Sequence, residues 1–143
     1  MADAFSILNE AQVLAALKKR TDQIEKAASV ALMAVAFEVE RQAKINALTG
    51  QHARGEGHIA GTGPGPNRVT GALIRSITTE RKQGFDGMYS ASIYPTMVYS
   101  RAVELGDERW KSGVRYPYLE PAAATVRKKA RTIFTETLKR RLR

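Results

Sequence analysis

The stretch "ALIRSITTERKQGFDGMYSASIYP", residues 72–95, decides the fold class of this chain. Its first part, residues 72–81, is rich in Ile and Thr, which favour β-strands. The dipeptide Asp86-Gly87 is typical of the tight turn in a β-hairpin. Beyond the turn, residues 89–93 alternate between apolar side chains and serines, as the half-buried strand of a sheet does. The stretch therefore predicts two antiparallel strands with one apolar face.

Good helix formers precede the hairpin from Asn9 to about Leu48, without a Gly or Pro. We expect a short first helix with Leu14 and Leu17 on its apolar face, then a longer helix capped by Asp22. Apolar residues of the longer helix recur at three- and four-residue steps: Ile24, Ala28, Ala31, Leu32, Val35 and Val39. Its centre is apolar nearly all round, which predicts burial on several sides, partly by a second copy of the chain.

A final helix is expected after the hairpin and after a short helical turn at residues 99–106. The segment "RYPYLEP", residues 115–121, should be extended, because Tyr116 and Glu120 each precede a proline. Pro121 suits the first position of the final helix. The apolar stripe of that helix is Val126, Ala130, Ile133, Phe134, Leu138 and Leu142.

These elements predict one α+β domain, residues 1–143, with a long N-terminal helix and a C-terminal helix packed on a small antiparallel β-sheet. A Gly/Pro-rich segment at about 50–69 should be a flexible loop that orders against a neighbouring subunit. It lacks the Lys-Ser/Thr pair and the following helix of a phosphate-binding P-loop. Thr70-Gly71 instead predicts the start of the first strand, with Gly71 providing backbone freedom.

Composition excludes several classes of function. The chain has 143 residues and no cysteine, which removes disulfides, thiolate zinc sites and cysteine nucleophiles. Its longest uncharged apolar run, Ala27–Phe37, is about half of the ~20 residues that a membrane-spanning helix needs. The N-terminus has no basic region of a secretory signal, so we expect a cytosolic product.

The chain is strongly basic, with 23 Lys and Arg against 14 acids and a net charge of +9. Residues 127–143 hold eight of these cations and a single acid, Glu136. Such a balance favours a polyanionic partner, and it nominates the C-terminal element as the surface that faces it.

No enzyme chemistry is predicted. His52 and His58, with Glu56 between them, have no rigid frame and no obvious third ligand, so we expect no metal site. Acids around "ELGDERW", at Glu104, Asp107 and Glu108, are typical of turn residues that are solvated or that cap a helix end. No catalytic residue and no cofactor site is expected.

Three stretches occur in order along the chain: "TGALIRSI" (70–77), "YSRAVELG" (99–106) and "YPYLEPA" (116–122). With helices before and after them, they resemble the small neck or tail-completion proteins of long-tailed bacteriophages, also described as minor tail components or head–tail connectors. The resemblance covers about residues 20–140. The chain departs from the family pattern at Ser100, where Ala is common, and at Asp107, where Thr is common.

The resemblance implies a structural virion protein, made in the bacterial host cytoplasm, that forms a ring at the head–tail junction. The ring would be a hexamer or dodecamer that contacts other head-completion and tail-tube or terminator proteins, with double-stranded DNA passing through. The motif residues expected to serve assembly are Thr70, Gly71, Leu73, Ser76, Tyr99, Glu104, Gly106, Pro117 and Pro121. The basic residues expected to face the DNA channel are Lys128, Lys129, Lys139 and Arg140. Charge alone leaves an alternative open, a nonspecific basic DNA-binding protein.

Overall fold

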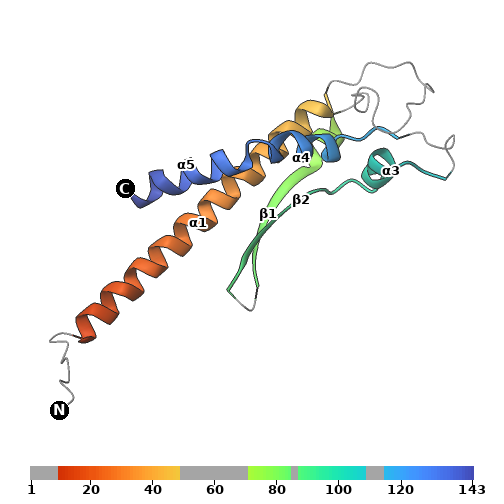
Figure 1. Cartoon of the computed structure of the whole chain (residues 1–143). Coiled ribbons are helices and arrows are strands. Elements are labelled where there is room, and N and C mark those ends of the chain that lie inside the picture. The colour runs from red at the N-terminus through yellow and green to blue at the C-terminus, as the bar shows by residue number, and fades with distance from the viewer. Residues whose placement is uncertain (1–9, 49–70, 85–86, 109–114) are drawn as a thin grey trace, which may run out of the picture.

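The computed structural model describes residues 10–48, 71–84, 87–108 and 115–143 (Figure 1). Within these residues the chain is α+β, with a long N-terminal helix, C-terminal helices and a two-stranded antiparallel sheet, as predicted. The elements in order are α1 (Glu10–Asn46), α2 (Ala72–Ser76), β1 (Ile77–Gln83), β2 (Tyr89–Pro95), α3 (Ser100–Leu105), α4 (Leu119–Arg127) and α5 (Ala130–Leu142). The predicted flexible loop at about 50–69 lies outside the described residues.

Helix α1 is continuous over 37 residues, so the predicted break before Asp22 is wrong. A capping residue ends a helix only where something stops the preceding turn, and this stretch contains no Gly or Pro. Thr21 continues the helix and donates its hydroxyl to the Leu17 carbonyl at 3.1 Å. At 1.5 Å per residue, α1 is about 55 Å long. The hairpin, α4 and α5 all pack against it.

The hairpin has the predicted alternation but begins later than predicted. Strands β1 and β2 pair from Ile77 opposite Pro95 to Gln83 opposite Tyr89. Residues 72–76 were expected to be strand, but they form the short helix α2. Leu73 and Ile74 both pack against the core cluster, whereas successive strand residues would point to opposite faces.

Helix α1 lies between two sets of elements. In Figure 1, α5 runs along one flank of α1 and the hairpin extends from the other. Polar bonds fix the hairpin to α1: Arg81 Nη1 donates to Ser29 Oγ at 2.9 Å, and Thr79 Oγ1 donates to Glu40 Oε2 at 2.5 Å.

The final helix is two helices, so the predicted single helix from Pro121 is wrong. A turn at Lys128 and Lys129 separates α4 from α5, and Lys129 leaves the helical region with φ −114° and ψ 0°. Its N–H still bonds to the Val126 carbonyl at 2.9 Å, which closes the last turn of α4. The turn redirects the chain so that α5 runs beside α1 (Figure 1).

The buried positions of α1 are small residues, and this differs from the predicted apolar stripe. Ala27, Ser29, Ala31, Ala36 and Ala43 are buried. The larger members of the predicted stripe are half-buried, and Ile24 is 44% exposed. Elements approach α1 from two flanks, so the positions that face them admit only small side chains, and the larger ones lie at the margins.

Replacing Ala43 with Leu should destabilise the fold, because Ala43 is 0% exposed in the core cluster and a larger side chain has no space there. The expected loss in the free energy of unfolding is about 1–3 kcal/mol. The matched control is Ala124→Leu on the exposed side of α4, which should stay within about 0.5 kcal/mol of the wild type. Urea denaturation followed by circular dichroism measures both, and equal effects would contradict the packing described.

Candidate functional site

The best-defined polar arrangement joins two of the family-like motifs through Glu104. This side chain is 9% exposed and lies on α3. Its Oε2 accepts the backbone N–H groups of Tyr118 at 2.8 Å and Leu119 at 3.0 Å, and its Oε1 accepts that of Glu120 at 2.7 Å. These N–H groups belong to the N-terminus of α4, so a carboxylate from another helix caps it. A negative charge at this end also complements the helix dipole.

Pro121 completes the cap. The first four N–H groups of an α-helix have no partner within it, and in α4 these positions are residues 118–121. Glu104 takes the first three, and the fourth residue is a proline that has no N–H. The helix therefore begins at Leu119, two residues before the predicted start, and Glu120 is helical although it precedes a proline. The predicted extended conformation of Glu120 is wrong because three bonds to Glu104 outweigh the local preference of a residue before proline.

The three motif segments meet around Tyr118. This residue is 0% exposed and belongs to a cluster with Ile77 from the first motif and Ala122 from the third. Val103, from the second motif, packs against the same cluster. Two bonds hold the Tyr118 backbone region: Asn46 Nδ2 donates to the Tyr118 carbonyl at 3.0 Å, and the Tyr116 N–H donates to the Val103 carbonyl at 2.8 Å. Segments that are distant in sequence thus form one structural unit.

The Tyr118 hydroxyl is buried within this unit. Burial, and then the charge of Glu104, raise the pKa of Tyr118 far above its usual value, while nearby Ser100 opposes the rise. The approach of Ser100 does not meet hydrogen-bond geometry, so the hydroxyl has no hydrogen-bond partner among the described residues. The phenol remains neutral and serves as a packing residue.

The other predicted motif residues occupy turns and helix ends. Gly71 is buried with φ 73°, a left-handed conformation that favours glycine, and it precedes α2. Ser76 donates its hydroxyl to the Leu73 carbonyl at 2.7 Å. Tyr99 precedes α3, and Gly106 ends it with φ 92°, as the predicted helical turn requires. Pro117 is half-buried, and Thr70 lies outside the described residues.

The four predicted channel-facing cations differ in their surroundings. Lys128, Lys139 and Arg140 are exposed. Lys129 instead turns toward α1, where its Nζ lies 2.6 Å from Glu38 Oε1. Glu38 also receives two bonds from Arg41, both at 2.8 Å. Lys129 is therefore a structural ion-pair partner of α1, and it shares the single negative charge of Glu38 with Arg41.

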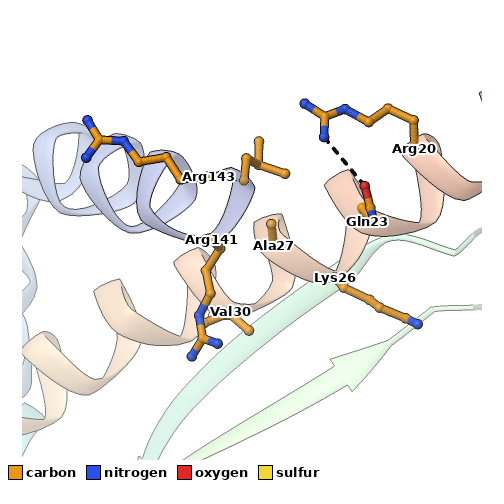
Figure 2. A pocket seen from close by; sticks show the side chains of 8 residues that line it. Arg20, Gln23, Lys26, Ala27, Val30, Arg141 and Arg143 are labelled. Atoms are coloured by element: carbon orange, nitrogen blue, oxygen red, sulfur yellow. Dashed lines mark hydrogen bonds between the residues drawn. The ribbon is translucent and has the colours of Figure 1, made fainter.

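A second basic feature lies where the end of α5 approaches α1 (Figure 2). We call it the α1–α5 cleft; its volume is about 380 Å³. Arg20 and Lys26 border it from α1, Arg141 and Arg143 border it from the α5 side, and Ala27 and Val30 contribute apolar surface. None of its lining residues is acidic. Figure 2 shows the cationic side chains of Arg20, Lys26 and Arg141 pointing in different directions, with that of Lys26 directed away from α5.

No protein-family model, no curated protein and no solved structure matches this chain. In the described part of the chain, no helix is both long and apolar enough to cross a membrane. The same residues contain no group of three or more His, Cys, Asp or Glu side chains that could hold a metal ion. His52 and His58 lie outside them.

Two features of the site escape sequence reasoning. Tyr118 looks like part of a proline-flanked extended segment, yet Tyr118, Ala122 and Val126 are all 0% exposed. Their four-residue spacing is a signal for a buried helical face that begins at Tyr118. The contribution of Arg20 and Lys26 to the cleft depends on where α5 packs, and no local pattern marks it.

Removing the Glu104 carboxylate should destabilise the fold strongly. In Glu104→Ala the N-terminal N–H groups of α4 lose their acceptor, and each buried unsatisfied group costs about 1–3 kcal/mol. We expect a loss of at least about 3 kcal/mol in the free energy of unfolding. Glu108→Ala, an exposed acid beyond the end of α3, is the control and should change it by less than about 0.5 kcal/mol. Similar values for both variants in chemical denaturation would rule out the capping role.

The Glu38 ion pairs should make stability depend on pH in the acid range. Hydrogen bonds from Arg41 and then Lys129 lower the pKa of Glu38 from 4.5 to about 2. A lowered folded-state pKa stabilises the fold fully above about pH 4.5, and this contribution is lost as the pH falls toward about 2. The stability difference between wild type and Glu38→Gln should therefore shrink over that range.

The control for this prediction compares two neighbouring lysines. Lys129→Gln should weaken the same acid dependence, whereas Lys128→Gln, which removes an exposed lysine, should leave it in place. Thermal or urea unfolding at a series of pH values measures these differences. A stability difference between wild type and Glu38→Gln that stays constant across the range would contradict the role of this ion pair.

Proposed function

We propose that this chain is a structural subunit of the neck of a long-tailed bacteriophage, in a ring at the head–tail junction around the DNA channel. The resemblance of the three motifs supports the proposal. Their residues form caps, turns and packing contacts around Glu104 and Tyr118, the roles that suit a scaffold. In this proposal the partners are further copies of the chain, other head-completion proteins and tail-tube or terminator proteins, and the subunit resides in the virion.

The observation that carries the proposal is the uncovered first half of α1. Every residue from 10 to 26 is exposed, and this part of the helix projects beyond the hairpin (Figure 1). Large apolar residues form a stripe along one side of this part of the helix. They are Val13, which is 47% exposed, Leu14 at 58%, Leu17 at 59% and Ile24 at 44%. In proteins most helix stability comes from packing of an apolar face, and this part of α1 has no buried residue. A second protein surface that covers the stripe would stabilise it, as expected of a subunit that functions only when assembled.

A ring also accounts for exposed apolar residues at the other end of the molecule. Val98 is 100% exposed and Leu105 is 59% exposed, both near α3 (Figure 1). Head-to-tail association joins two different surfaces of identical subunits, and it closes into a ring when the rotation allows. Two apolar regions at opposite ends are compatible with such association.

The alternative is a nonspecific DNA-binding protein, which the net charge of +9 favours. The two functions differ in what the free subunit does. A DNA-binding protein should bind duplex tightly at low salt without assembling, whereas a neck subunit should bind free DNA weakly.

The assembly role predicts that Leu14→Ser with Leu17→Ser prevents assembly while the core stays folded. Burial of each leucine contributes about 1.5–3 kcal/mol, so losing both should weaken subunit association by more than about 100-fold. Native mass spectrometry and electron microscopy of purified rings measure assembly, and circular dichroism checks folding. Gln12→Ser with Ala15→Ser, on the opposite face of the same exposed helix, is the matched control and should assemble normally.

The head–tail role predicts the phenotype of a null allele in the phage genome that encodes the chain. DNA-filled heads and free, unjoined tails should accumulate, and the wild-type gene supplied in trans should restore complete virions. The Leu14→Ser, Leu17→Ser variant should fail to restore them. Normal virions without the protein, or a gene that belongs to no phage, would overturn the proposed function.

A further inference from the structure

We propose that the α1–α5 cleft binds the phosphate backbone of duplex DNA. The choice of duplex DNA as the ligand rests on the proposed function, in which DNA passes through the ring. The preference of the cleft for an extended polyanion rests on its own geometry and charge.

The side chains that line the cleft are basic or neutral. Arg20, Lys26, Arg141 and Arg143 border it, and no acid lines it. Asp22 and Glu25, the acids of the same stretch of α1, are not among its lining residues; Asp22 borders a neighbouring pocket together with Lys26. Like charges held near one another repel, so this arrangement opposes folding of the free subunit. A bound anion relieves that repulsion.

The helix dipole explains only part of this charge. Cations in the last turn of a helix interact favourably with its negative end, and the last turn of α5 carries Lys139, Arg140 and Arg141. The same argument does not apply to Arg20 and Lys26, which lie far from the C-terminal end of α1 at Asn46. The helix dipole therefore does not account for the two cations on the α1 side of the cleft.

The distribution of the cations favours a chain of anions over a single ion. Arg20 and Lys26 are six residues apart, which is about 9 Å along the helix axis. Their side chains and that of Arg141 diverge (Figure 2), whereas a site for one ion would bring donors together. Phosphates of one DNA strand follow one another every ~3.4 Å along the duplex axis, so the cleft spans several of them. Three of the four cations are arginines, whose planar forks match phosphate oxygens.

The experiment measures DNA binding by the free full-length chain as a function of salt. Fluorescence anisotropy with a labelled duplex of about 20 base pairs, from about 25 to about 200 mM NaCl, gives the slope of log K against log salt. The wild type should bind weakly, with a dissociation constant of roughly 1 μM or higher. Arg20→Gln with Arg141→Gln should reduce the slope by about 2 and weaken binding more than about 10-fold near 0.1 M salt.

Two variants with the same change in charge are the controls. Lys82→Gln with Arg101→Gln removes exposed cations from the hairpin and α3 and should leave the slope unchanged. Lys139→Gln with Arg140→Gln removes exposed cations outside the cleft lining and should reduce the slope less than the cleft variant does. Equal slopes for the cleft variant and either control would overturn the inference. Circular dichroism confirms that all variants are folded.

Further outcomes separate this inference from the proposed function. Displacement of DNA by polyglutamate of equal charge, as efficiently as by unlabelled duplex, would overturn DNA as the ligand. Nanomolar binding that depends on Arg20 and Arg141 would support the cleft and favour the DNA-binding alternative over the neck subunit. An unchanged salt slope in the cleft variant overturns the cleft even if the null allele produces unjoined heads and tails.

Discussion

The carboxylate of Glu104 at the start of α4 is the interaction on which the arrangement of the core depends. It accepts three backbone N–H groups, one buried and two part-buried, that have no partner within α4, and it therefore fixes α3 against α4. Placing α4 in turn places Tyr118, Ala122 and Val126, the three fully buried residues at its N-terminal end and along its inner face. A proline at the fourth position is compatible with this because its missing N–H needs no acceptor.

Helix α1 imposes the second constraint. Two flanks of one helix are covered, by the hairpin and by α4 with α5, and the buried residues of α1 are alanines and one serine. Small side chains allow close approach, and specific polar bonds then set the register: Arg81 to Ser29, Thr79 to Glu40 and Lys129 to Glu38. These bonds direct polar side chains of α1 inward, toward neighbouring elements. The first half of α1, with its stripe of exposed apolar residues, extends beyond all of these contacts and remains available for another protein surface.

Residues that maintain the fold and residues that remain on the surface form separate sets in this chain. The motif residues that resemble phage neck proteins are used within the fold, as caps, turns and packing contacts. The features left for partners are elsewhere: the exposed leucines of α1, the apolar residues near α3, and the cations of the α1–α5 cleft. A subunit of this kind conserves its shape through one set of residues and makes its contacts through another.

Local sequence by itself determined the element types with strong signals. The absence of Gly and Pro before residue 48 specifies a helix, the alternation after Asp86-Gly87 specifies β2, and Gly106 specifies the end of α3, because each depends on local backbone preference. Tertiary structure decided the features that local backbone preference leaves undetermined or disfavours. Residues 72–76 are helical because this conformation lets both Leu73 and Ile74 pack against the same core cluster. Helix α4 begins at Leu119 because Glu104 supplies acceptors for the N–H groups at its N-terminus. Tertiary structure also paired Lys129 with Glu38 and placed Arg20 and Arg141 on the border of one cleft, since only the packing of α5 on α1 brings together elements so distant in sequence.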